Sequence, residues 1–348
     1  MEPYGEGSFM KIGCLSLALC LSLFLHATVL AQDFYQGKTI RIIVGGTAGG
    51  GFDVYSRAMA RHMSRHIPGN PTLIVENMTG AATRIAAKYL YSAAKPDGLT
   101  FGIFNGYLIL GRVLGMKGLD FDVRKFEYIG VPVRDNVVCA LTKASGVTSL
   151  GQWLAAKPPV KIGALGPGNS TSDVPRVLKA ALDLPVSLVE GYKGTADIRL
   201  AADGGEVGGG CWAWESVKVT WSKGLESGDV GVVIQAAPKA AADLPKVPVA
   251  LEVAKSEEAR QLIRAGVVGP SSITRVYVTT PGTPRERVQM LRKAFADTLR
   301  DPEFAAEAKK SRLQIDPLTG EEVEKTVAGL FNLSPSTVSK LAAVLAVK

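Results

Sequence analysis

The most informative segment of the chain is TIRIIVGGTAGGGFDVYSR, from Thr39 to Arg57. Its β-branched start, 39–44, predicts a buried strand, and the pattern from Asp53 onward predicts a helix. Between them lies a loop rich in glycine: Gly45, Gly46, Gly49, Gly50 and Gly51. A strand, a glycine loop and a helix in this order bring backbone N–H groups to the positive end of a helix, where an anion is stabilised. The anion is either a nucleotide phosphate or another anionic group.

The N-terminus indicates export. Lys11 precedes an apolar stretch, 12–25, and small residues follow up to Ala31. This is the pattern of a secretory signal peptide, residues 1–31, cleaved after Ala31. The alternative is an uncleaved anchor helix, but the apolar stretch is shorter than the roughly 20 residues that a membrane span needs. We therefore expect a periplasmic protein, secreted with a cleaved signal peptide.

Two cysteines, Cys139 and Cys211, remain after cleavage. In an oxidising compartment they can form a disulfide, or they can be two small buried residues, and the sequence leaves both readings open. Their spacing excludes a zinc site of the CxxC type, so we expect no metal there.

Length and charge restrict the class of protein. The chain has 348 residues and a formal net charge of +8, and it is long enough for two domains even without the signal peptide. The positive charge is not gathered into Lys/Arg blocks. Together with export, this argues against nucleic-acid binding. Two interpretations of the positive charge remain. The protein is basic without a functional consequence, or its electrostatic field attracts anionic ligands.

Strands and helices alternate along the chain, which predicts an α/β fold of parallel sheets covered by helices. The expected strands are 39–44, 72–75, 100–104, 126–133, 137–142, 160–164, 186–189, 230–235 and 276–280. The expected helices are 84–94, 150–156, 173–182, 196–202, 285–300, 302–311, 320–331 and 334–347. For the helix at 173–182, Asp173 is the expected N-cap residue, since a proline follows two residues later.

A second loop of the same kind, 161–173, leads from strand to helix through Gly-Pro-Gly-Asn-Ser at 166–170. Each loop alone is a common connection. Ligands of open α/β sheets bind beyond the carboxyl ends of the strands, where both loops lie. Two such loops in different halves of the chain therefore predict one ligand held from two sides.

Motifs of other functions do not match. The first loop lacks the Gly-Lys-Ser/Thr ending of a P-loop, and its glycines do not fit GxGxxG. His62 and His66 are spaced to share a helix face, but no acidic or cysteine residue stands beside them in the sequence, so a surface pair is the preferred interpretation. The chain contains no HExxH or GxSxG pattern. We expect no cofactor, and a free carboxylate replaces phosphate as the favoured anion.

Several motifs together resemble the substrate-binding proteins of tripartite tricarboxylate transporters, the Bug family. They span nearly the whole exported chain in the family's order. The segments that carry the resemblance are GGGFDVYSR (49–57), VENMTGAA (75–82), KPDGLT (95–100), GPGNS (166–170), GYKG (191–194), GGEV (204–207) and TPGTP (280–284).

The resemblance implies a periplasmic binding protein type II-like fold, with two doubly wound lobes joined by a two-strand hinge. Lobe 1 would comprise residues 32–132 and 275–348, and lobe 2 the inserted residues 133–274. Such proteins hold a small organic carboxylate through backbone N–H groups and deliver it to the membrane subunits of the tripartite transporter. We therefore expect a monomeric binding protein, not an enzyme. The alternative is an exported α/β enzyme acting on an anionic substrate.

Most of the expected ligand-binding residues lie in or next to the loops that carry the resemblance, whereas Arg84 and Trp212 lie where the chain departs from the family pattern. The full set is Thr47, Ala48, Gly49, Gly50, Gly51, Asp53, Thr79, Gly80, Arg84, Gly166, Pro167, Gly168, Asn169, Ser170, Tyr192 and Trp212. For Asp53 the expected role is to cap its helix and fix the loop, leaving backbone N–H groups for the ligand.

Two departures from the family pattern matter. The loop 78–83 lacks the usual Pro-Gly-Ala-Gly-Gly, and Arg84 after it is either an added carboxylate clamp or a solvated arginine in a first helical turn. After Gly-Gly-x-Val an acid is missing, which weakens the case for an α-amino acid ligand. Trp212 and Trp214 in that region either face a larger or aromatic acid or pack one side of a strand.

Overall fold

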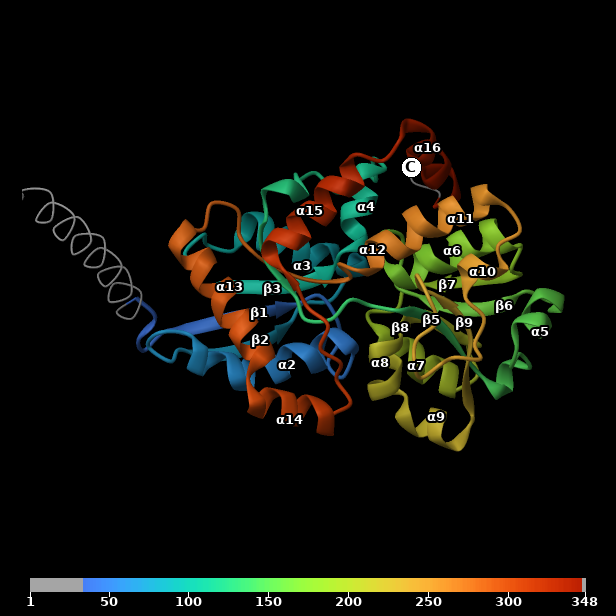
Figure 1. Ribbon diagram of the computed structural model, residues 1–348, viewed down its shortest axis with the longest axis horizontal. Helices are drawn as coiled ribbons and strands as arrows, with labels where there is room; N and C mark the ends of the chain where they lie inside the picture. The colour runs from blue at the N-terminus through green and yellow to red at the C-terminus, as the bar shows by residue number, and fades with distance from the viewer. Residues whose placement is uncertain (1–33, 346–348) are drawn as a thin grey trace, which may run out of the picture.

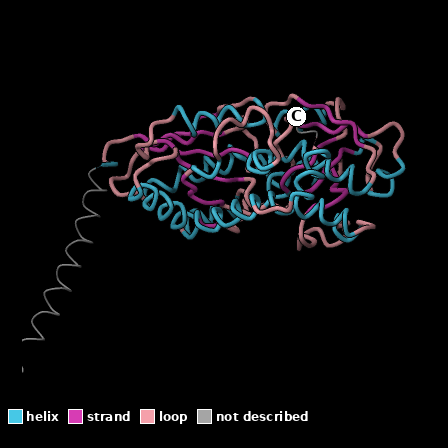
Figure 2. Tube along the Cα trace, turned by 90° about the horizontal axis from the view of Figure 1, so that it is seen from above, coloured by secondary structure: helices cyan, strands magenta, loops and turns pink. Residues whose placement is uncertain are grey.

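The computed structural model describes residues 34–345. Two lobes lie side by side in an elongated, rather flat molecule (Figures 1 and 2), and each lobe is built on one sheet with helices on both faces. The expected signal peptide, 1–31, lies outside the described residues. Within 34–345, no helix is long and apolar enough to cross a membrane.

The first sheet is mixed, not purely parallel. β1 pairs in parallel with β2 and β3, whereas β10 runs antiparallel between β3 and β4. The expectation of a parallel sheet is wrong for β10, because this strand enters from the other lobe in the opposite direction. The six strands, in the order β11-β4-β10-β3-β1-β2, are β1 Thr39–Val44, β2 Thr72–Asn77, β3 Thr100–Asn105, β4 Glu127–Val131, β10 Arg275–Thr279 and β11 Leu318–Thr319.

Alternate residues of β1 face opposite sides of this sheet, as the strand pleat requires. Ile42 and Val44 pack into the core under α2, α13 and α14, while Ile43 packs into the core under α3, α4 and α15. The helices that cover the sheet are α2 Gly51–Met63, α3 Arg84–Lys88, α4 Tyr107–Val113, α13 Arg285–Arg300, α14 Pro302–Lys310 and α15 Gly320–Phe331.

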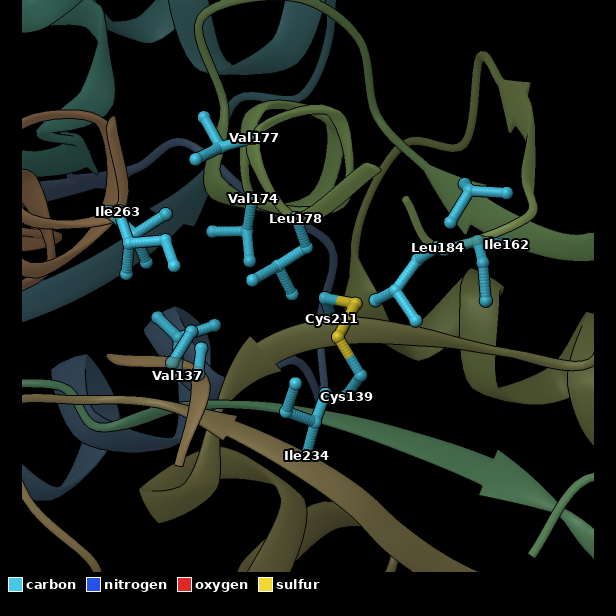
Figure 3. Close-up of a cluster of buried hydrophobic side chains, with 14 of the residues drawn as sticks. Val137, Cys139, Ile162, Val174, Val177, Leu178, Leu184, Cys211, Ile234 and Ile263 are labelled. Carbon is cyan, nitrogen blue, oxygen red and sulfur yellow. A yellow bond between two sulfur atoms is a disulfide. The ribbon is translucent and has the colours of Figure 1, made fainter. Parts of the chain in front are cut away.

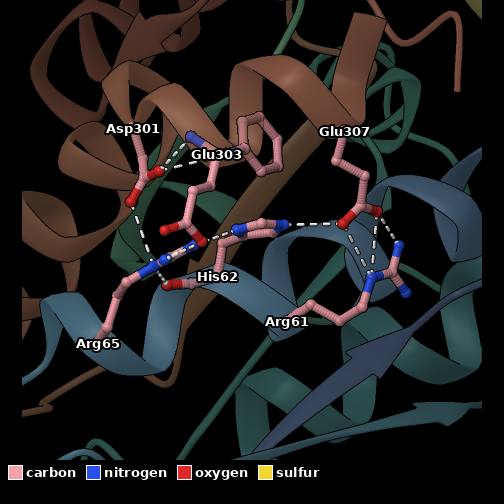
Figure 4. A network of polar contacts seen from close by, with 7 residues as sticks. Arg61, His62, Arg65, Asp301, Glu303 and Glu307 are labelled. Atoms are coloured by element: carbon pink, nitrogen blue, oxygen red, sulfur yellow. Dashed lines mark hydrogen bonds and ion pairs between the residues drawn. The ribbon is translucent and has the colours of Figure 1, made fainter. Parts of the chain in front are cut away.

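Both histidines belong to an ion-pair network that joins α2 and the short helix after it, Ser64–His66, to α14 and its N-cap residue, and Figure 4 shows the part around His62. His62 Nε2 lies 2.7 Å from a carboxylate oxygen of Glu307, and His66 Nε2 lies 2.8 Å from one of Asp301. The acidic partners that the sequence did not place nearby thus come from the C-terminal part of the chain. Among residues 34–345, no cluster of three or more metal-ligating side chains occurs.

The second sheet repeats the plan of the first. β6 is parallel to β7 and β8, and β5 runs antiparallel between β8 and β9. Its strands, in the order β7-β6-β8-β5-β9, are β5 Val137–Thr142, β6 Val160–Ala164, β7 Val186–Glu190, β8 Gly209–Ala213 and β9 Val230–Ala236. Its helices are α5 Leu150–Ala155, α6 Ser170–Leu182, α7 Thr195–Asp203, α8 Trp214–Thr220, α9 Ser222–Ser227, α10 Ala250–Val253, α11 Glu257–Ile263 and α12 Gly269–Ser271.

A disulfide joins the two antiparallel strands at the centre of this sheet. Cys139 on β5 and Cys211 on β8 are register partners and are bonded to each other. The bond lies in the hydrophobic core between α6 and the sheet, near Leu178 and Ile234 (Figure 3). The question that the sequence left open is therefore answered in favour of pairing.

The last helix, α16 Pro335–Val344, packs on the second lobe although the first-lobe helix α15 precedes it (Figure 1). Its Leu341 belongs to the core beneath α6 and α11. The sequence-based division assigned residues 275–348 to lobe 1, so the described part of α16 departs from that division. The other lobe boundaries remain predictions.

Candidate functional site

A pocket lies between the two lobes, beyond the carboxyl ends of β1 and β6. It encloses about 470 Å³ of empty space, the open mouth included. The lobes and the segments that join them all contribute. Its lining residues are Gly45, Gly46, Thr47, Gly50, Gly51, Phe52, Thr83, Asn105, Asp135, Leu165, Asn169, Ser170, Thr171, Gly194, Thr195, Trp212, Ala213, Ser216, Thr274 and Arg275.

Helices α2, α6 and α7 begin at this pocket. Gly51, Ser170 and Thr195 are their first residues, and all three line it. The first N–H groups of a helix have no partner within the helix, and the helix dipole makes this end positive. The two lobes therefore direct positive helix ends at the same small space, which favours an anionic ligand group.

The first glycine loop, Gly45–Gly51, is held by the carboxylate of Asp53. This carboxylate accepts hydrogen bonds from Gly49 N (2.9 Å), Arg57 Nε (2.9 Å) and Asn77 Nδ2 (3.0 Å). Burial by itself would raise the pKa of Asp53, but these bonds outweigh it and hold the pKa below its ordinary value. The carboxylate is thus ionised and rigidly held.

The expected capping role of Asp53 is wrong in detail. Helix α2 begins at Gly51, and Gly50 occupies the N-cap position without a side-chain cap. Asp53 lies inside the first turn and fixes the loop, as expected, by bonding back to Gly49. The glycines let the backbone reach the pocket directly, and Gly49 has a φ of +74°, which glycine adopts readily.

The second glycine loop, Leu165–Asn169, is held mainly by hydroxyl groups. Leu165 N donates to Thr171 Oγ1 (2.9 Å), and Gly166 N donates to Ser172 Oγ (2.8 Å). Asn169 is the N-cap of α6, since its side-chain oxygen accepts from Thr171 N. The sequence-based choice of Asp173 as N-cap is therefore wrong.

Asp173 lies in the first turn of α6 and turns back toward the second glycine loop. Its Oδ1 accepts from Gly168 N at 3.1 Å, while its Oδ2 has no hydrogen-bond partner among residues 34–345. Burial raises the pKa of Asp173 to about 7. The Asp53 carboxylate has several hydrogen bonds that offset the cost of burying its charge, whereas the Asp173 carboxylate accepts one, from Gly168 N.

The lobes touch across the pocket at positions where a side chain would not fit. A Cβ atom on Gly51 would lie 1.9 Å from Ser216 Oγ, and one on Gly194 would lie 2.2 Å from Thr47 Oγ1. Asn105 of β3 donates to Ser170 Oγ of α6 at 3.0 Å. The pocket is consequently narrow, and glycine is needed on both sides of it.

A buried ion pair forms the wall of the pocket where the chain crosses between lobes. Arg275 is the first residue of β10, and Asp135 lies between β4 and β5. Arg275 Nε donates to Asp135 Oδ1 at 2.6 Å, and Arg275 Nη2 donates to Ser216 Oγ at 2.5 Å. The guanidinium also lies 4.6 Å from the ring centre of Tyr55. Sequence reasoning missed both charged residues; the available signal was an arginine at the start of an otherwise apolar strand.

Glu215, on the first turn of α8, adds a second buried acid to this region. It accepts from the backbone N and the side-chain amide of Asn136, both at 3.1 Å. Burial, followed by the repulsion from Asp135, raises the pKa of Glu215 to about 7. The region therefore carries one guanidinium and two carboxyl groups.

The predicted site residues divide into two groups. Those that line the pocket are Thr47, Gly50, Gly51, Asn169, Ser170 and Trp212. Outside the lining are Ala48, Gly49, Asp53, Thr79, Gly80, Arg84, Gly166, Pro167, Gly168 and Tyr192. Arg84 Nε instead donates to Ala81 O at 2.9 Å, and the Tyr192 hydroxyl donates to Glu206 at 2.5 Å. Binding itself stays a prediction for all of these residues.

The two tryptophans have different surroundings. Trp212 lines the pocket and stacks on Trp221, with ring centres 5.6 Å apart. Trp214 belongs to the same hydrophobic core, and its Nε1 donates to Asp243 at 2.9 Å. Trp212 alone of the pair faces the pocket, and both also pack the second lobe.

A narrow pocket between two α/β lobes, bordered by helix N-termini from each, defines a solute-binding protein of the two-lobed class. The sequence pattern of the family described as "Tripartite tricarboxylate transporter family receptor" (TctC) matches residues 55–328. The chain belongs to this family.

Known proteins agree with this assignment. The chain is 24% identical over 337 residues to the "UPF0065 protein in gbd 5'region" of Cupriavidus necator, covering 95% of this chain and 96% of that protein. It is similar to the periplasmic binding protein BugD, with a TM-score of 0.73 and 20% identity over 90% of this chain and 99% of that one. MatC (Rpa3494) of Rhodopseudomonas palustris with bound malate gives a TM-score of 0.68 and 19% identity, covering 88% and 99% of the two chains. Rpa4515 of R. palustris with adipate gives a TM-score of 0.70 and 20% identity, covering 89% of this chain and 98% of that one. At these identities the solved structures show the fold.

Proposed function

We propose that this protein is an extracytoplasmic binding protein that captures a small organic carboxylate between its lobes and delivers it to a tripartite membrane transporter. The observation that carries the proposal is the convergence of α2, α6 and α7 on one pocket. A carboxylate that leaves bulk water needs several N–H donors at once, and helix N-termini from both lobes supply them.

The family and the solved structures support the ligand class. The family description names a tripartite tricarboxylate transporter receptor, and two structures of the same fold are described with adipate and with malate. We extend the carboxylate class, but neither particular acid, to this chain. The pocket is narrow because the lobes approach each other closely at Gly51 and Gly194, and this narrowness favours a small acid.

The proposal includes how the protein reaches its ligand and releases it. Residues 1–31 are removed on export, and the mature protein acts as a monomer in the periplasm. Residues 132–136 and the chain before β10 join the lobes, so a rotation about these segments opens and closes the pocket. The membrane subunits of the transporter recognise the loaded, closed form.

Calorimetric titration against a panel of mono- and dicarboxylates tests ligand capture. We expect at least one acid to bind stoichiometrically and to be recovered unchanged, and we expect the amide of the same acid, which lacks the charge, to bind far more weakly. Chemical conversion of a bound acid would instead favour the exported α/β enzyme. Failure of every carboxylate to bind or to raise the Tm contradicts the proposal.

Delivery and export need separate measurements. Uptake of the labelled ligand by cells should depend on this gene and be restored by the wild-type chain. Mass spectrometry of the periplasmic protein should give a chain that begins at residue 32. An intact N-terminus would overturn the cleavage, and unchanged uptake without the gene would overturn the delivery step.

A further inference from the structure

The wall of the pocket nearest the lobe crossings contains polar groups that the protein itself leaves unsatisfied. Arg275 and Asp135 are 1% and 5% exposed, and both line the pocket. Arg275 Nη1 and Asp135 Oδ2 have no hydrogen-bond partner among the described residues. Trp212 Nε1, 2% exposed and also in the lining, has none within the same part of the chain.

These three atoms have complementary hydrogen-bonding needs. Arg275 Nη1 and Trp212 Nε1 are N–H donors that need an acceptor, whereas Asp135 Oδ2 is an acceptor that needs a donor. Leaving buried polar atoms unpaired is costly, and native proteins rarely do so without a reason. A ligand group that both accepts and donates hydrogen bonds would satisfy all three.

The charges on this wall select among such groups. Arg275 is paired with Asp135 at 2.6 Å, and both residues line the pocket, so this pair carries no net charge. A second carboxylate on the ligand would meet Oδ2 of Asp135, and an ammonium group would meet Nη1 of Arg275, both unpaired within the described residues. An uncharged hydroxyl or carboxamide meets neither repulsion and fulfils both hydrogen-bonding roles.

We propose that the ligand is a monocarboxylate with an uncharged hydroxyl or carboxamide at its far end, bound by Arg275, Trp212 and Asp135. This rests on the proposed function, because the helix N-termini of α2, α6 and α7 must hold the carboxylate. Arg275, Asp135 and Trp212 then determine specificity, and they distinguish this pocket from one that takes a dicarboxylate.

Titration of the wild-type protein with matched acids tests the inference without any mutation. Linear acids of three to six carbons are compared with five far ends: methyl, hydroxyl, carboxamide, carboxylate and ammonium. At the best chain length, the hydroxyl or carboxamide acid should bind at least tenfold more tightly than the methyl, carboxylate and ammonium acids of equal length.

Variants then assign the effect to the named atoms. Trp212→Phe keeps an aromatic ring but removes the Nε1 donor. Asp135→Asn keeps the shape of the side chain but replaces one carboxylate oxygen with an NH₂ group, which donates hydrogen bonds. Each should lower the ratio of the affinity for the hydroxyl or carboxamide acid to the affinity for the methyl acid about tenfold, whatever happens to the two affinities themselves. A merely structural role would weaken both acids equally. Arg134→Gln, next to Asp135 but half exposed and paired with Asp316, is the matched control.

The outcomes separate the two proposals. Tightest binding of a dicarboxylate or an amino acid, or affinity that ignores the far end, overturns this inference and leaves carboxylate capture standing. An equal loss for both acids in the variants also overturns the assignment to these atoms. Failure of all the acids, together with the wider carboxylate panel, removes the proposed function and this inference with it.

Discussion

The two glycine loops hold the same position in their lobes but are stabilised in opposite ways. In each, an aspartate of the first helical turn accepts a hydrogen bond from a loop glycine: Asp53 from Gly49 and Asp173 from Gly168. Asp53 also has a cation, Arg57, and its pKa is lowered. Asp173 makes no ion pair with any described residue and is fully buried, and its pKa is raised to about 7.

A position at a helix N-terminus therefore does not by itself decide whether an acid is charged. Both aspartates experience a helix dipole that favours the anion. Desolvation opposes this effect, and a paired arginine decides the balance at Asp53. The first loop is therefore held by an ion pair, and the second by hydroxyls together with an acid that is half protonated near neutral pH.

The largest effect is expected where the first loop touches the second lobe. Gly51→Ala places a methyl group 1.9 Å from Ser216 Oγ and 2.9 Å from Ser216 Cβ, so the lobes must separate and ligand affinity should fall about 100-fold. Calorimetry with the best ligand measures this. Gly151→Ala, in α5 with no atom near the added methyl, is the control. Affinity within threefold of wild type would show that the lobes need not approach so closely.

Asp53→Asn should have the next largest effect. It removes the charge that binds Arg57 and Gly49, and hydrogen bonds to charged groups contribute about 1.5–3 kcal/mol. We expect the free energy of unfolding at pH 7, measured with urea, to fall by about that amount. The stabilisation from an acid with a lowered pKa exists above its ordinary pKa and is lost as the pH falls, so the variant and wild type should converge in acid. Asp316→Asn, at an exposed pair, should change little.

Asp173→Asn should show the opposite dependence on pH. The raised pKa of Asp173 stabilises the fold below the acid's ordinary pKa, and this contribution is lost as the pH rises toward 7 and above. Asparagine does not titrate. The free energy of unfolding of the variant minus that of wild type should therefore be larger at pH 8 than at pH 5, by about 2 kcal/mol. If variant and wild type differ by the same free energy of unfolding at pH 5 and at pH 8, Asp173 is ionised at both pH values.

The smallest effect is expected for Arg84→Ala. The geometry favours the solvated arginine over the clamp, because Arg84 donates to Ala81 O and lies outside the pocket lining. Affinity for the best carboxylate should change less than twofold. A tenfold loss would instead match a charged hydrogen bond to the ligand and restore the clamp.

Most of the architecture could be predicted from the sequence, because local patterns and tertiary needs agree there. The glycine loops and most of the predicted strands and helices lie within a few residues of their predicted positions, whereas helix α4 and helices α8 to α12 were not predicted. Strand β8 was not among the predicted strands and entered only through one of the two interpretations of Trp212 and Trp214, because its glycines have low strand propensity. Yet a Cβ on Gly209 would lie 2.1 Å from Ala140 O, so close packing against β5 requires glycine.

The site was less predictable than the fold. The loop residues Thr47 and Ser170 follow from motifs, but Arg275 and Asp135 meet only in the folded chain, 140 residues apart in sequence. Charged residues are mostly exposed, so the arginine at the start of an apolar strand was only a weak signal for Arg275, and no local pattern marked Asp135 as buried. Their role depends on where the chain crosses between the lobes, which single-chain patterns do not reveal.

The disulfide turns part of the second lobe into a covalent ring. The bond between Cys139 and Cys211 spans a sequence separation of 72 residues that includes β6, α6, β7 and α7. A protease that cuts one peptide bond in this ring leaves both ends attached to the protein. Closing a loop of this length also restricts the unfolded chain, a stabilisation on the order of 4 kcal/mol. A single cut in this ring therefore releases no fragment from the lobe that supplies the second glycine loop.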